Sequence, residues 1–181
     1  MKELFNLVIL FMVLLNSVKI TAQINNLVPN PSFEDYYLEF YPQFECDTLA
    51  VCINWTNPTL GNPDYYNKVS CSLVSVPSNE KGFQYAYDGF GYYFFATYWH
   101  YDTVQGAYLF REYIQTELKE GLKANKEYCV SFYISLADSS LYATDRIGAF
   151  FSDTAIRRVD TKNFNFIPQV TTVLILKNKV L

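Results

Sequence analysis

The sequence predicts an all-β fold of the sandwich type, and three observations support this. Sixteen Tyr and fifteen Phe among 181 residues favour pleated, half-buried strands. Short apolar runs are separated by Pro and Gly turn signals. No segment carries a long helical period. Short strands at this spacing are typical of a β-sandwich, whereas strands alternating with helices would indicate a parallel sheet.

The clearest alternation lies in residues 111–138. Apolar and polar residues alternate along Tyr113–Leu118, and a second alternating run follows the turn at Gly121–Asn125. A period of two is that of a strand with one buried face, so we expect a strand pair at the centre of the sandwich. One face of its second strand would carry Tyr128, Val130, Phe132, Ile134 and Leu136, and the other Cys129, Ser131, Tyr133, Ser135 and Ala137.

The remaining strands are expected as short runs between turns. The sequence Asp-Gly-Phe-Gly at residues 88–91 indicates a hairpin, and two prolines place the first strand at a sheet edge. The expected strands are Asn26–Glu34, Val51–Trp55, Val69–Val76, Phe83–Tyr87, Tyr92–Trp99, Ala107–Leu118, Glu127–Ala137, Arg146–Phe151 and Thr171–Leu176. Loops are expected at Asp35–Thr48 and Asn57–Asn67, with a short helical turn or loop at Ser139–Thr144.

The first 22 residues have the pattern of a signal peptide. Lys2 precedes an apolar run, Leu4–Leu15, and Ala22 offers a small residue at the cleavage point. The run is shorter than the ~20 apolar residues that span a bilayer. We therefore expect an exported chain with no transmembrane segment in its mature part. Residues 23–181 are long enough for a single β-sandwich domain with its own core.

Charge argues against two classes of partner. Removing residues 1–22 leaves 12 basic and 17 acidic residues, a net charge near −5. A nucleic-acid-binding protein would need a basic face, and an anionic membrane surface would need a polybasic patch. We expect neither.

The four cysteines are disulfide candidates, because an even number in an exported chain permits one or two bridges. They are Cys46, Cys52, Cys71 and Cys129, and we expect at least one bridge among the first three. A zinc site is the alternative, but there is no CxxC pair and the sole histidine, His100, is distant in sequence.

No set of residues indicates catalysis. His100 lies in an aromatic stretch without a nucleophile elbow, and sequence singles out no pair of facing carboxylates. We therefore expect that the protein is not an enzyme.

Glycan binding is better supported, because exposed aromatic rings offer flat apolar faces to sugars and neighbouring polar side chains can bond the hydroxyls. The alternative is that the same aromatics fill the core. The candidate residues form two clusters, Asp64, Tyr65, Tyr66 and Asn67, and Tyr98, Trp99, Tyr101 and Asp102.

Several motifs in a fixed order carry a family resemblance. They are NLVPNPSFE (26–34), NPTLGNPDYYN (57–67), VPSNEKGFQYAYDGFGYY (76–93), REYIQTEL (111–118) and ANKEYCVSFYISLADSSLYATDRIGAFFS (124–152). The order resembles the N-terminal β-sandwich of surface and cell-envelope proteins of gliding, type IX-secreting Gram-negative bacteria, over residues 26–168. The stretch LKEGLKANKEYCVSFY (118–133) is also similar to galactose-binding jelly rolls and carbohydrate-binding modules.

The resemblance implies an all-β, galactose-binding-like jelly roll in the periplasm, at the outer membrane or on the cell surface. Such proteins usually continue beyond the position of Pro168–Gln169 into further strands, and then into an OmpA-like peptidoglycan-binding or gliding-motility sorting domain. We therefore expect a sandwich that is incomplete at its C-terminus and lacks its closing strands. The resemblance also implies a structural calcium site at Glu34, with Asn30 lending a carbonyl; no other cofactor is expected.

The expected function is that of a non-catalytic, exported interaction module, the N-terminal part of a larger cell-envelope protein. Its partners would be cell-envelope proteins or glycans. The alternatives are a carbohydrate-binding module that contacts glycans through exposed aromatics, and an accessory domain of a secreted hydrolase.

Overall fold

The computed structural model describes residues 25–41, 47–97, 99–103, 106–141, 143–144 and 146–173. The strands are β1 (Tyr36–Phe40), β2 (Thr48–Cys52), β3 (Trp55–Thr56), β4 (Asp64–Asn67), β5 (Ser78–Asn79), β6 (Gly82–Phe83), β7 (Gly91–Phe94), β8 (Trp99–Thr103), β9 (Gly106–Phe110), β10 (Gln115–Thr116), β11 (Arg146–Ala149) and β12 (Val170–Val173). Among these residues the only helical element is the 3₁₀ turn η1 (Ser72–Val74). The predicted all-β class is confirmed.

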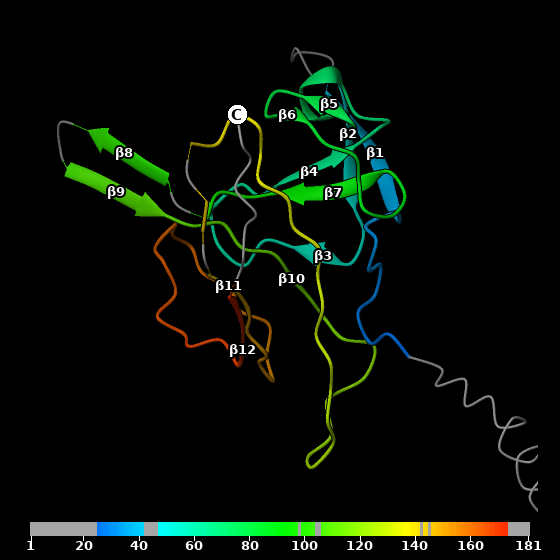
Figure 1. Cartoon of the computed structure of the whole chain (residues 1–181), viewed down its shortest axis with the longest axis vertical. Coiled ribbons are helices and arrows are strands. Elements are labelled where there is room, and N and C mark those ends of the chain that lie inside the picture. The colour runs from blue at the N-terminus through cyan, green and yellow to red at the C-terminus, as the bar shows by residue number, and fades with distance from the viewer. Residues whose placement is uncertain are drawn as a thin grey trace, which may run out of the picture.

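The described strands pair into small antiparallel sheets of two strands each. The pairs are β1–β2, β3–β10, β4–β7, β5–β6, β8–β9 and β11–β12. Figure 1 shows β1, β2 and β4–β7 gathered in one part of the molecule, with the β8–β9 hairpin projecting to one side and β11 and β12 below the hairpin. The finer expectation, a galactose-binding-like jelly roll, stays a prediction.

The predicted central strand Glu127–Ala137 is wrong. The described structure assigns it no strand pairing, and Phe132, Ile134 and Leu136 are each more than a third exposed. Its predicted partner, Ala107–Leu118, is divided between β9, which pairs with β8, and the two-residue β10, which pairs with β3. The alternating pattern therefore belongs to an extended segment that pairs with none of the described strands (Figure 1). It contacts Gln84 and Tyr87 through side chains.

The predicted hairpin at residues 88–91 is also wrong. β7 pairs with β4, although β4 lies in a stretch expected to be loop, and β6 pairs with β5. Pairing with β4 places Tyr66 against the rings of Tyr92 and Phe94, where it is fully buried. Burying a Tyr ring between two others favours this longer-range pairing over the local turn.

Other boundaries shift for similar reasons. β1 lies in the expected loop Asp35–Thr48, and η1 occupies the expected strand Val69–Val76. The predictions Arg146–Phe151 and Thr171–Leu176 overlap β11 and β12, which pair with each other.

The core is small and aromatic. Ala50, Cys52 and Tyr65 are its buried residues, and five partly buried side chains pack against them. These five are Phe33, Tyr36, Trp55, Val69 and Tyr93. The ring of Phe33 lies 5.1 Å from Trp55 and 5.4 Å from Tyr93, centroid to centroid, in tilted and edge-on arrangements that aromatic pairs favour.

Residues 150–168 are held against the rest of the structure by side chains in and next to β10. The amide of Gln115 donates to the carbonyl of Ile156 and accepts from its N–H, at 2.9 and 3.1 Å. The ring of Tyr113 packs 4.7 Å from Phe164. These contacts fix the segment without a wide sheet.

Asn30 joins the N-terminal turn to the first sheet. Its side-chain Nδ2 donates to the carbonyls of Asp35 and Ile53, both at 2.9 Å, and its Oδ1 accepts the N–H of Asp35 at 3.0 Å. Its own carbonyl accepts the indole N–H of Trp55 at 3.0 Å. Asn30 is 8% exposed and has a φ of +43°, a left-handed conformation that Asn tolerates better than most residues.

We expect Asn30→Ala to lower the free energy of unfolding by about 3 kcal/mol, because it leaves buried backbone groups without partners at about 1–3 kcal/mol each. Urea denaturation of the purified chain measures this loss. Asn30→Gly, which accepts the positive φ, should lose slightly less. Asn26→Ala, at an exposed position, is the control; equal stability of the Asn26 and Asn30 variants would contradict the assignment.

Candidate functional site

The first predicted glycan cluster lies mostly inside the protein. Tyr65, Tyr66 and Asn67 are 9%, 0% and 0% exposed, so the prediction that they contact a glycan is wrong. They are buried because β4 pairs with β7 and packs into the core. Asn67 Nδ2 donates to the Tyr65 hydroxyl at 2.7 Å, and that hydroxyl donates to the carbonyl of Phe33. The polar side chains of Tyr65 and Asn67 thus form hydrogen bonds inside the protein.

The second predicted cluster stays a prediction. Trp99, Tyr101 and Asp102 lie in β8, whose backbone pairs with β9, and Tyr98 lies outside the described residues.

The predicted calcium ligands do not fit a metal site. The Asn30 carbonyl already accepts two N–H groups, from Trp55 and from Phe33. One carboxylate oxygen of Glu34 accepts the N–H of Phe90 at 2.6 Å, so Glu34 caps the turn at 88–90. Calcium needs six or more oxygen ligands, and no cluster of three or more metal-binding side chains occurs in the described part of the chain.

The cysteines differ in state. Cys71 is disulfide-bonded, whereas Cys52 and Cys129 are free thiols, which corrects their assignment as disulfide candidates. Cys52 lies in the core beside Asn30 Nδ2, at 3.3 Å, and burial raises the pKa of its thiol to about 12. Cys129 is exposed on the extended segment. Cys46 lies outside the described residues.

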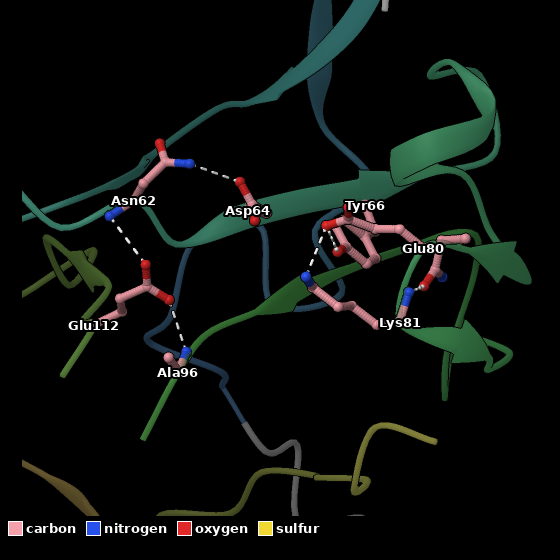
Figure 2. A network of polar contacts seen from close by, with 8 residues as sticks. Asn62, Asp64, Tyr66, Glu80, Lys81, Ala96 and Glu112 are labelled. Atoms are coloured by element: carbon pink, nitrogen blue, oxygen red, sulfur yellow. Dashed lines mark hydrogen bonds and ion pairs between the residues drawn. The ribbon is translucent and has the colours of Figure 1, made fainter. Parts of the chain in front are cut away.

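Two half-buried acidic side chains, Asp64 at the start of β4 and Glu112, belong to one network of polar contacts (Figure 2). Asp64 Oδ1 accepts from the Asn62 side chain at 2.9 Å. Glu112 accepts the backbone N–H groups of Asn62 and Ala96, at 3.1 and 2.7 Å. Burial, reinforced by the charges of Glu112 and Glu80, raises the pKa of Asp64 to about 6.

These carboxylates connect loops. Each oxygen of Glu112 is bonded to a different backbone segment, so Glu112 joins the loop before β4 to the chain that leaves β7. Burial also raises the pKa of Glu112, against the opposing effect of these two N–H donors. The arrangement is that of a structural link.

Asp64 should make stability depend on pH. Its pKa in the folded protein lies above its ordinary value of 3.8, so the folded state binds the proton more tightly. The stability from Asp64 is therefore present below about pH 4 and is lost as pH rises through about 6. D64N should reduce the difference in unfolding free energy between pH 4.5 and pH 7.5 by on the order of 1 kcal/mol, after allowing for solvent screening.

Urea denaturation of both proteins at the two pH values measures this difference. D153N, on an exposed bend, is the matched control and should follow the wild type. An unchanged pH profile in D64N would refute the role of Asp64.

Four aromatic residues that are each more than half exposed lie at another place, here called the aromatic face. It consists of Phe83, Tyr85, Tyr87 and Tyr133, which are 56%, 66%, 70% and 67% exposed. The rings of Phe83 and Tyr85 meet edge to face at 5.2 Å. Tyr87 and Tyr133 stack with centroids 3.3 Å apart. Tyr133 thus adds its ring to those of residues 83–87, which are distant from it in sequence.

Hydrogen bonds hold these two segments together. The N–H of Phe83 donates to Asp138 Oδ2 at 2.9 Å, and the Ser135 hydroxyl donates to Gln84 Oε1 at 2.6 Å. The N–H of Ser139 donates to the carbonyl of Lys81 at 3.1 Å. The rings of the aromatic face are therefore carried by a fixed pair of backbones.

The sequence interpretation missed all four residues of the aromatic face as site candidates. The sequence Phe-Gln-Tyr-Ala-Tyr at 83–87 places aromatics at alternate positions, but this pattern also predicts a strand of a hairpin.

Comparison with protein-family models, curated proteins and solved structures finds no match. No helix in the described ranges is long and apolar enough to cross a membrane.

Proposed function

We propose that this chain is a non-catalytic, exported interaction module of a Gram-negative cell envelope, the N-terminal part of a larger envelope protein with a jelly-roll-like sandwich. The observation that carries the proposal is the aromatic face. Four rings that are each more than half exposed lie on two adjoining segments and contact one another in two pairs. Exposed patches of this kind are uncommon on soluble proteins and commonly mark interaction sites.

The rigidity of the aromatic face supports a binding role. Its rings contact one another in pairs, and hydrogen bonds from Ser135 and to Asp138 fix the backbones beneath them. A surface that is already ordered loses less conformational entropy when it binds.

The motif resemblance supports the envelope assignment. Its first motif contains Asn30 and Glu34, which organise the N-terminal turn and cap the turn at 88–90. Its second contains Tyr65 and Tyr66, which lie in the interior. The resembling residues therefore carry the fold, as expected of a domain shared with envelope proteins.

The half-buried carboxylates of Asp64 and Glu112 support a non-catalytic role. Both oxygens of Glu112 are bonded to backbone N–H groups, and Asp64 is bonded to Asn62. A general base must reach a substrate proton, and Glu112 is committed to two loops.

Co-sedimentation with Gram-negative envelope fragments, outer membrane with attached peptidoglycan, tests the proposal. The double variant Tyr87→Ser/Tyr133→Ser should lower the bound fraction at least fivefold, because it removes the stacked rings. Exposed substitutions change stability little, so circular dichroism should show an intact fold.

Tyr37→Ser on β1 is the matched control, since this tyrosine is 50% exposed and lies outside the aromatic face. It should bind like the wild type. Failure of the wild type to sediment with the fragments, or equal binding by all three proteins, would refute the proposed function.

A further inference from the structure

We infer that the aromatic face binds a neutral glycan chain, an inference that rests on the proposed function and names the partner of the same surface. The four rings come from Phe83, Tyr85, Tyr87 and Tyr133, and the polar side chains of Gln84 and Ser135 lie between the two segments that carry them. The residues differ from both clusters that the sequence predicts.

The geometry provides flat apolar surfaces. The stack of Tyr87 on Tyr133 is nearly parallel, with an interplanar angle of 11°. Each ring is about two-thirds exposed, so the stack leaves ring surface open to solvent. The apolar C–H face of a pyranose packs against such a ring, as other flat apolar groups do.

Hydrogen-bonding groups accompany the rings. Three of the four aromatic residues are tyrosines, whose hydroxyls can both donate and accept. Gln84 and Ser135 are bonded to each other at 2.6 Å and are both exposed. A sugar offers hydroxyls on its edges and an apolar face, which matches this combination of rings and short polar side chains.

The charge at the border of the aromatic face favours a neutral ligand. Asp88 follows Tyr87 directly, and Asp138 bonds the backbone of Phe83. The nearby cation, Lys81, is paired with Glu80 at 2.9 Å. An anionic sugar would approach these carboxylates, and like charges repel.

The size of the aromatic face favours a glycan over a folded protein. Four large rings, each more than half exposed, present on the order of 500 Å². A stable protein interface covers ~800 Å² on each partner and places its anchors in well-packed pockets. A few sugar residues stacked on rings need less area and no surrounding rim.

Titration calorimetry with chitohexaose, a neutral β-linked hexasaccharide, tests this inference together with a glycan array that contains neutral and anionic chains. Binding by the wild type should be unchanged between 50 and 500 mM NaCl, because the ligand carries no charge. Tyr87→Ser and Tyr133→Ser should each raise Kd at least tenfold. Gln84→Ala, which keeps every ring, should raise it about threefold.

Tyr37→Ser is again the control and should leave Kd unchanged. Absence of binding to every neutral glycan, a preference for anionic chains, or equal Kd values in all variants would overturn the inference. If tyrosine-dependent sedimentation with envelope fragments persists in that case, the proposed function stands and the partner is an anionic glycan or a protein. If sedimentation is absent as well, the proposed function fails with it.

Discussion

The hydrogen bonds of Asn30 are the constraint on which the packing of the described core depends. One side chain satisfies backbone groups before β1 and after β2, and the Asn30 carbonyl orients Trp55. Strand pairs of this length are marginal in water by themselves. Because Asn30 ties the end of the β1–β2 pair at which β1 begins and β2 ends to the N-terminal turn, the rings of Phe33 and Trp55 can close over the core from one side.

A second constraint follows from the small size of the core. With few buried aliphatic residues, the interior of this chain is filled by rings, and rings need partners at defined angles. Tyr66 finds two, Tyr92 and Phe94, only if β4 pairs with β7 across more than twenty residues of chain. The same pairing buries Asp64 beside Glu112, so the raised pKa of Asp64 is a consequence of how the core is filled.

Sequence patterns predict the fold class and several of the strands, but they do not predict which strands pair. The alternation at 128–136 indicates an extended chain, but it does not indicate whether a partner strand lies beside that chain. A Gly-containing turn at 88–91 is a local signal, whereas the burial of Tyr66 is a non-local gain that decides the pairing. The prediction that residues 64–67 contact a glycan is wrong for the same reason. The sequence Asp-Tyr-Tyr-Asn could equally face solvent or core, and the pairing of β4 with β7 buries its two tyrosines.

The lack of a strand ladder between the two segments that carry the aromatic face also explains why its rings are exposed. The segments 83–87 and 133–138 meet mainly through side chains, so their alternate rings are not enclosed by a second sheet. Replacing rings that are about two-thirds exposed with smaller polar residues would cost the fold little, typically within ~0.5 kcal/mol. Stability therefore does not account for three tyrosines and a phenylalanine on one surface. Under the proposed function, ligand recognition accounts for them, because an exposed ring face gains free energy when a flat apolar group packs against it.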